Sequence, residues 1–154
     1  MKTIIIYDSS HHMNTRKLAE ALQGPGVAVV PVTEAGALSL NDYDLIGLAS
    51  GIEFSQLRPS IRNLVLNRLQ PGMKVFFLYT AGRPSPRYVQ PMEQAAKEKG
   101  VQVLGAFGCH GLDTWGPFAL IGGMNRGHPD VRDIAAARTF FRQVTEKAGG
   151  RPSV

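Results

Sequence analysis

Short apolar runs recur along the chain, and stretches with helical periodicity separate them. The runs are rich in β-branched and aromatic residues, which is typical of strands buried on both faces of a sheet. We expect strands over residues 4–7, 27–32, 45–49, 75–79 and 101–107. Strands that alternate with helices predict an α/β fold, a doubly wound three-layer sandwich with one parallel sheet between two layers of helices.

The stretches between these runs place apolar residues on one helix face. The first of them buries Leu18, Ala19, Ala21 and Leu22, and further helices are expected over residues 59–69 and 88–99. The last helix, residues 130–147, is expected to bury Val131, Ile134, Ala137, Phe141 and Val144. Residues 33–44 are too irregular to predict more than a short helix or a loop. The tail, residues 149–154, is expected to fray.

Small and polar residues follow four of the predicted strands. They occupy residues 8–14, residues 50–54, residues 80–83 and the chain from Gly108 onward. In a parallel sheet the carboxyl ends of the strands meet at one edge, and ligands bind there where the connection order reverses. The sequence therefore predicts a ligand site at this edge.

The first of these loops has the composition of an anion site. Hydroxyl and amide side chains crowd the segment from Asp8 to Thr15, between a predicted strand and a predicted helix. Asn14 can cap that helix by accepting from free backbone N–H groups. Outward-pointing N–H groups and the helix dipole favour negative charge, so a ligand that carries a phosphate is expected.

Composition is that of a globular protein. The 154 residues are 44% hydrophobic and 19% charged, and no apolar run has the roughly 20 residues of a membrane span. We expect one domain, residues 1–154, without a cleavable signal segment. The single cysteine excludes an internal disulfide and favours a reducing cytoplasm. The net charge of +5 comes from scattered basic residues, which favours a solvated basic surface over nucleic-acid binding.

With these loops in view, the sequence resembles the flavodoxin family over its whole length. Residues 9–15 are similar to the hydroxyl-rich phosphate loop that usually ends in Gly-Asn-Thr. Residues 50–52 (Ser-Gly-Ile) and 80–82 (Thr-Ala-Gly) are similar to the two loops that hold the flavin ring. Residues 109–130, CHGLDTWGPFALIGGMNRGHPD, resemble a segment of one subgroup of small flavodoxin-like proteins. The resemblance implies a five-stranded parallel sheet of order 2-1-3-4-5 and FMN as the cofactor.

The same resemblance implies a role for individual residues. The phosphate would be bound by Ser9, Ser10, His12, Met13, Asn14 and Thr15. The isoalloxazine ring would be flanked by Ser50, Gly51 and Ile52 on one side and by Thr80, Ala81 and Gly82 on the other. Cys109 and Trp115 complete the expected cofactor-binding set. FMN would carry the electrons, and the protein would orient it and tune its potential.

The sequence departs from the family pattern at two positions and in its charge. Met13 stands where the loop usually has glycine, so a positive φ there would require a rebuilt loop. Glu53 stands where an aromatic residue is common, and its carboxylate would repel a reduced anionic ring. The basic net charge differs from that of acidic electron-carrier flavodoxins, and the electron donor or acceptor, a protein or a small molecule, stays open.

Several single residues admit a second interpretation. His11 and His12 do not form a known zinc pattern with Cys109, His110 or His128, so we expect no metal site. Cys109, at the end of a buried strand, is interpreted as an inert core residue. Trp115 either stacks on the flavin or fills the base of its long loop, and both readings stay open.

Three other functions compete with an FMN-dependent electron carrier or oxidoreductase. A phosphoryl-accepting module needs an acidic pair after the first strand, and the loop offers only Asp8. A serine hydrolase needs a Gly-x-Ser-x-Gly turn, which the sequence lacks, and a cysteine phosphatase needs an arginine after its cysteine. The runner-up is a binding or regulatory module that has kept this fold and lost the cofactor, and Met13 is its support.

Overall fold

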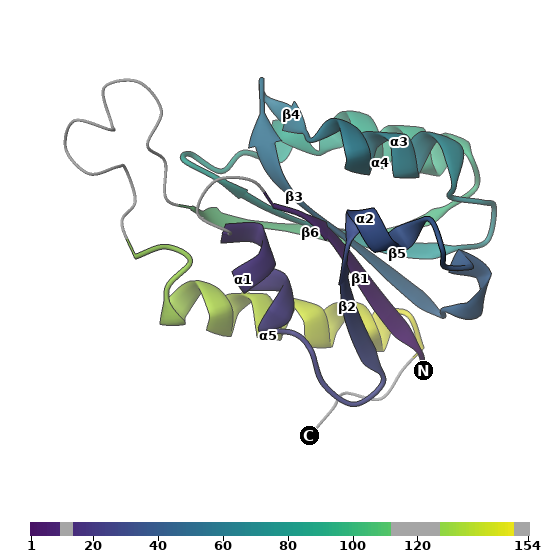
Figure 1. Ribbon diagram of the computed structural model, residues 1–154, viewed down its shortest axis with the longest axis horizontal. Helices are drawn as coiled ribbons and strands as arrows, with labels where there is room; N and C mark the ends of the chain where they lie inside the picture. Colours follow the sequence, from purple (N-terminus) through teal and green to yellow (C-terminus); the bar gives the residue numbers. More distant parts are fainter. Residues whose placement is uncertain (10–13, 112–126, 150–154) are drawn as a thin grey trace.

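A parallel sheet forms the centre of the computed structural model, which describes residues 1–9, 14–111 and 127–149. Its long strands are β1 (Thr3–Asp8), β2 (Val27–Pro31), β3 (Leu45–Glu53), β5 (Lys74–Ala81) and β6 (Gln102–His110). They lie in the order β2-β1-β3-β5-β6, and the short β4 (Gln56–Leu57) pairs antiparallel with the end of β3 (Figure 1). With β4 set aside, this is the predicted order 2-1-3-4-5, and the predicted fold class is confirmed.

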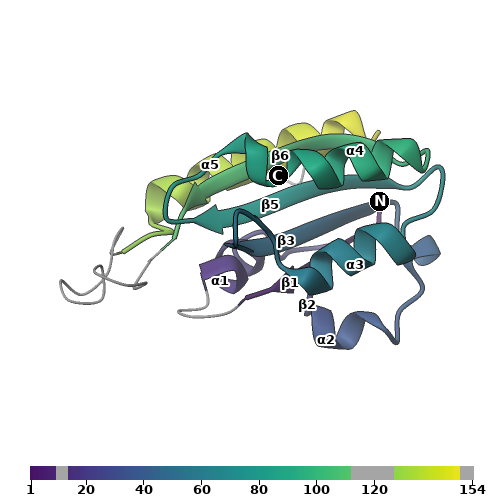
Figure 2. The same ribbon diagram turned by 90° about the horizontal axis from the view of Figure 1, so that it is seen from above.

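Helices cover both faces of the sheet (Figures 1 and 2). One face carries α1 (Asn14–Glu20) and α5 (Val131–Lys147), and the other carries α2 (Val32–Ala35), α3 (Pro59–Asn67) and α4 (Gln90–Glu98). Among the described residues, the connections contain the short 3-10 helices η2 (Leu40–Asp42) and η3 (Pro86–Tyr88). Within the described ranges, no helix combines the length and the apolar character that crossing a bilayer requires.

The side chains of the strands form two separate hydrophobic cores, one on each face of the sheet, because successive side chains of a strand point to opposite faces. Ile5 and Phe76 pack with Leu18 of α1, whereas Ile4 and Phe77 pack with Ile61 of α3. All six side chains are fully buried. Each such aromatic or aliphatic side chain contributes about 1.5–3 kcal/mol on burial, so the two cores together hold the strands in register.

Three strands extend further than the apolar pattern predicts. β3 continues to Glu53, β5 to Ala81 and β6 to His110, so residues 50–52, residues 80–81 and Cys109 lie in strands rather than in loops. The cause is the backbone ladder, which continues through small and polar residues that the apolar pattern alone cannot assign to a strand. The expected loops at these positions are therefore wrong.

The helix predictions need two smaller corrections. The first helix ends at Glu20, although Leu22 beyond it is still buried. Val131 was expected in the core and is 85% exposed, because it is the first residue of α5 and follows the Asp130 cap. Ala137 and Val144 are buried as predicted, and Ile134 and Phe141 pack against the same core.

Candidate functional site

The carboxyl ends of β1, β3, β5 and β6 meet in one row. Ser50 pairs with Asp8 on one side, and Gly51 pairs with Thr80 on the other. Thr80 in turn pairs with Cys109, and the next pair along is Ala81 with His110. The register thus brings together predicted site residues from three distant parts of the sequence.

The start of α1 lies against this row, through one pair of hydroxyl groups and one close approach at Gly111. Thr15 Oγ1 lies 2.9 Å from Thr80 Oγ1, and both side chains are almost fully buried. A Cβ added to Gly111 would lie 2.7 Å from Asn14 Nδ2 and 3.2 Å from Thr80 Cβ, so only glycine fits there without a shift. The pair of hydroxyls uses one proton, and the proton of the accepting hydroxyl remains for another bond.

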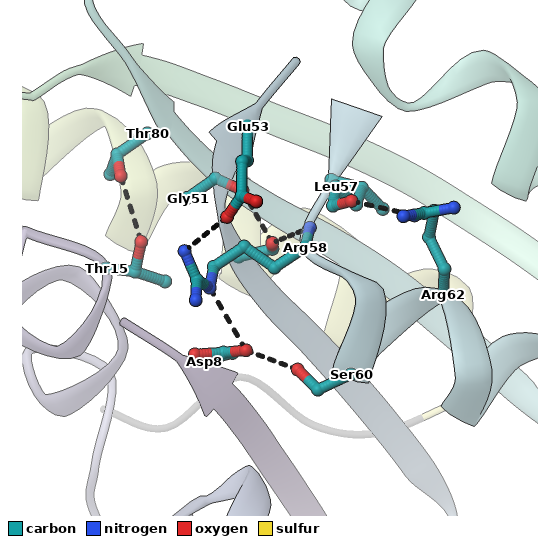
Figure 3. A network of polar contacts seen from close by, with 10 residues as sticks. Asp8, Thr15, Gly51, Glu53, Leu57, Arg58, Ser60, Arg62 and Thr80 are labelled. Atoms are coloured by element: carbon teal, nitrogen blue, oxygen red, sulfur yellow. Dashed lines mark hydrogen bonds and ion pairs between the residues drawn. The ribbon is translucent and has the colours of Figure 1, made fainter. Parts of the chain in front are cut away.

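An arginine that sequence analysis did not identify organises the charged part of the site (Figure 3). Arg58 Nε lies 3.1 Å from Asp8 Oδ2, and Arg58 Nη1 donates to Glu53 Oε2 over 2.8 Å. Ser60 Oγ also donates to Asp8 Oδ2. The carboxylate of Glu53 is thus compensated by a neighbouring guanidinium, which the sequence pattern did not indicate.

The Arg58 backbone also fixes Ser50. Its N–H donates to Ser50 Oγ over 2.9 Å, and Ser50 Oγ donates to the Gly51 carbonyl over 2.6 Å. Ser50 is fully buried. Its hydroxyl therefore fixes the end of β3. A Cβ added to Gly51 beside it would make ordinary van der Waals contacts, at 3.8 Å to Thr15 Oγ1 and 4.0 Å to Arg58 Cδ.

A tight hairpin follows β3, with Phe54 and Ser55 at its turn. Their φ values are 52° and 60°, as in a two-residue type I′ turn, and Phe54 is 87% exposed. Such a turn usually has the sequence Asn-Gly. Phe-Ser does not match it, so the sequence did not predict this hairpin. The turn presents an aromatic side chain next to Glu53.

The predicted phosphate loop is described at its two ends. Ser9 follows β1, and its Oγ is buried without a hydrogen-bond partner in the part of the chain that the structure describes. A buried hydroxyl without a partner is costly, which makes Ser9 Oγ a candidate donor to a ligand. Ser10, His12, Met13 and Trp115 lie outside the described residues, as does His11.

Cys109 lies in the core between the sheet and α5. Burial, and after it the nearby carboxylates of Asp133 and Asp130, raise the pKa of the Cys109 thiol to about 12. The side chain is 4% exposed. The thiol therefore stays protonated at neutral pH and is a poor nucleophile.

A cavity of about 920 Å³ lies at the opposite edge of the sheet. Residues at the amino ends of the strands line it, among them Thr3, Val27 and Lys74, together with Phe141 and Thr145 of α5. It does not coincide with the row of polar residues at the carboxyl ends. The chemistry of the carboxyl edge, rather than the size of this cavity, identifies the candidate site.

Comparison with known proteins places the chain in a family. No protein-family model matches it. The uncharacterized protein MJ0298 of Methanocaldococcus jannaschii is 33% identical over 147 residues, which cover 94% of this chain and 98% of that protein. The chain belongs to the same family as this archaeal protein. The solved structures that the chain resembles are flavodoxins and flavodoxin-like proteins, so the chain has a flavodoxin-like fold.

Two solved structures illustrate this likeness. Flavodoxin 1 from Bacillus cereus superimposes with a TM-score of 0.69 at 16% identity, over 95% of this chain and 98% of that one. A flavoprotein from Lactobacillus acidophilus, solved in complex with FMN, has a TM-score of 0.55 at 18% identity, over 70% of this chain and 92% of that one. Identities this low show the flavodoxin-like fold alone. The resemblance expected from the sequence is confirmed at that level.

Proposed function

We propose that this flavodoxin-like protein binds FMN at the carboxyl edge of its sheet and acts in electron transfer or as a small flavin-dependent oxidoreductase. One observation carries the proposal: β1, β3 and β5 bring Ser9, Gly51 and Thr80 to the edge at which open α/β sheets bind ligands. The Lactobacillus acidophilus flavoprotein, which has a similar fold, was solved in complex with FMN.

The residues present fit an FMN phosphate and a flat ring. The buried Ser9 hydroxyl lacks a partner among the described residues, and a phosphate oxygen would accept from it. Around the phosphate we place Ser9, Ser10, His12, Met13, Asn14 and Thr15. Around the ring we place Gly51, Ile52, Thr80, Ala81 and Gly82, with Ser50 and Cys109 behind them and Trp115 beside them. Gly51 carries no side chain, so its backbone can lie close to a planar group.

Arg58 offsets part of the negative charge near the proposed ring position. Glu53 alone would oppose negative charge on a reduced ring, but its carboxylate is paired with Arg58 Nη1. Asp8 shares the same guanidinium, so the three side chains together carry one net negative charge. When bound, FMN supplies one- and two-electron chemistry, and these side chains set the field in which it works.

Electron exchange requires a second molecule, and we propose a protein or small-molecule donor or acceptor. The Phe54 side chain stands exposed beside Glu53 at the end of β3, close to the proposed ring position. It provides an apolar surface for contact with the ring or with such a partner.

FMN titration of the flavin-free protein tests the proposal. We expect one FMN per chain with a Kd of about 1 μM or tighter, or roughly −8 kcal/mol, followed by changes in flavin absorbance and fluorescence. Ser9→Ala removes the unpartnered hydroxyl and is expected to weaken binding about tenfold. Ser39→Ala, at an exposed serine whose side chain caps nothing, is the matched control and should bind as the parent does.

A folded protein whose spectrum does not respond to FMN would overturn the proposal. That result would leave the fold unchanged and would favour the runner-up, a binding or regulatory module without the cofactor. Weaker binding in Ser39→Ala than in Ser9→Ala would contradict the placement of the phosphate.

A further inference from the structure

Two histidine rings lie next to each other at the end of β6. His110 is the last residue of β6, and His128 lies shortly before α5. Their ring centroids are 5.6 Å apart, with an angle of 55° between the ring planes. The pair lies outside the set of residues that we assign to FMN.

Each ring uses Nδ1 to hold its orientation. His110 Nδ1 lies 3.1 Å from the Gly82 carbonyl oxygen, and His128 Nδ1 lies 2.6 Å from Asp133 Oδ2. A carbonyl and a carboxylate only accept hydrogen bonds, so both Nδ1 atoms must be the donors. In the neutral imidazole the other nitrogen, Nε2, then carries the lone pair.

The carboxylate that orients His128 is itself rigidly held. Asp133 Oδ2 accepts from the Asp130 N–H over 2.8 Å, and the Asp133 N–H donates to Asp130 Oδ1 over 3.0 Å. This capping box fixes the first turn of α5. Lys17 Nζ of α1 donates to the Pro129 carbonyl over 2.7 Å and ties the same segment to the neighbouring helix.

We propose that His110 and His128 bind a divalent transition-metal ion, of which zinc is the type, through their Nε2 atoms. Histidines that ligate metals usually donate the other ring N–H to a carboxylate or a backbone carbonyl, and both of these partners occur here. Two imidazoles bound to one tetrahedral ion through Nε2, at about 2 Å each, have centroids roughly 5 Å apart. The observed separation of the two ring centroids, 5.6 Å, is close to this value.

We assign the nearby carboxylates of Asp130 and Asp133 a role other than metal binding. Ligand atoms of His128, Asp130 and Asp133 lie within 4.8 Å of one another. However, Asp130 Oδ1 and Asp133 Oδ2 already accept the hydrogen bonds of the α5 cap. We therefore assign Asp133 to orient His128, and water or a small anionic ligand to the remaining positions of the ion. Imidazole ligands select borderline ions such as Zn²⁺, Ni²⁺ and Cu²⁺ over Mg²⁺ and Ca²⁺.

Zinc titration of the flavin-free chain, without a histidine tag, tests the site independently of FMN. We expect one Zn²⁺ per chain by calorimetry, and NMR of the imidazole nitrogens should show the Nε2 signals of His110 and His128 shifting while their Nδ1–H groups persist. His110→Asn and His128→Asn should each weaken binding at least tenfold. Asp133→Asn should weaken it about 10- to 100-fold through the lost orientation.

The control variant replaces a histidine outside both proposed sites, His11→Asn, and should bind zinc as the parent does. Binding that is lost in this variant and kept in His110→Asn and His128→Asn would overturn the proposal. Binding lost in Asp130→Asn and Asp133→Asn but kept in His110→Asn would move the ion to the cap carboxylates and overturn the two-histidine site. The absence of any zinc-induced shift at His110 and His128 would also overturn it. Circular dichroism checks that each variant is folded.

Discussion

Arg58 Nε lies 3.1 Å from Asp8 Oδ2 and joins the segment before α3 to the carboxyl end of β1. The Arg58 and Asp8 side chains are about one-quarter and one-fifth exposed, so solvent screens this ion pair only in part. The same guanidinium reaches Glu53 from its other side. Arg58 therefore compensates two carboxylates that would otherwise repel each other and any anionic ligand.

Replacing Arg58 by glutamine should destabilise the fold. The change leaves the partly buried Asp8 carboxylate without its guanidinium, and we expect the free energy of unfolding to fall by about 1–3 kcal/mol. Urea unfolding measures this loss. Arg16→Gln is the matched control, because Arg16 pairs with Glu20 across one exposed helix turn, where solvent screens the ion pair, and stability should hardly change. Equal losses in both variants would contradict the structural role of Arg58.

The buried hydroxyls of Thr15 and Thr80 should be energetically coupled. Thr80→Val or Thr15→Val leaves the other hydroxyl buried without its partner, at a cost of about 1–3 kcal/mol each. In the double variant both polar groups are gone, so the total loss should be smaller than the sum of the two single losses. A double-mutant cycle by urea unfolding measures this coupling. Strict additivity would show that the 2.9 Å contact contributes nothing.

Much of the fold could be predicted because long apolar runs signal buried strands. The runs around Ile5, Leu48 and Phe77 lie in the expected strands, and the strand order follows from the family resemblance. Strand ends were harder to predict, because Ser50 and Thr80 continue the ladder through backbone bonds that no side-chain pattern reports.

The candidate site was predictable in part. Gly51, Thr80 and Ala81 lie at the expected edge, because parallel strands bring their carboxyl ends together. Arg58 was missed, because its role depends on two carboxylates that only the folded chain places beside it. From sequence, His110 and His128 were considered only as further ligands beside His11 and His12, a combination whose spacing matches no zinc pattern. Their proximity arises from how α5 packs on β6.

Gly108 should tolerate no side chain. A Cβ there would lie 2.1 Å from Tyr79 Cζ, inside the ring of a buried neighbour. We expect Gly108→Ala to lower the free energy of unfolding by about 1–3 kcal/mol or more, as overpacking does. Gly24→Ala is the control, because no atom of the described residues lies within 4 Å of its added Cβ. Thermal unfolding of both variants compares the two positions, and equal melting temperatures would contradict the predicted clash.

The Cys109 thiol should resist alkylation in the folded protein. Its pKa of about 12 leaves far less thiolate at pH 8 than in the unfolded chain, whose thiol has a pKa near 8.5, so the native rate should be roughly 1,000-fold lower. Iodoacetamide labelling with and without denaturant measures this ratio. A native rate close to the denatured one would show that the thiol is exposed.

The same thiol makes stability depend on pH in the alkaline range. The unfolded state loses the thiol proton first, and the folded state retains it up to about pH 12. The unfolded state therefore binds fewer protons between about pH 9 and pH 12, and stability falls as pH rises, by up to about 1.4 kcal/mol per pH unit. Urea unfolding at a series of pH values should show this fall, and Cys109→Ala should reduce it.

The turn at Phe54 and Ser55 should be a place where stability and function oppose each other. Both residues have positive φ, which costs about 1 kcal/mol or more for a side chain other than glycine. Ser55→Gly should therefore raise the free energy of unfolding by about 1 kcal/mol, whereas Ser39→Gly, at a φ of −92°, should lower it slightly. Urea unfolding distinguishes the two.

Phe54→Asn should also stabilise the turn, because asparagine accepts the left-handed conformation more readily than phenylalanine. If the exposed phenyl ring of Phe54 contacts the flavin, Phe54→Asn should weaken FMN binding, whereas Ser55→Gly should leave FMN binding unchanged. FMN titration of the two variants makes this comparison. Unchanged FMN affinity in Phe54→Asn would show that the Phe54 side chain does not contact the cofactor. Contact with a partner would then be the explanation for an aromatic side chain that is 87% exposed on a strained turn.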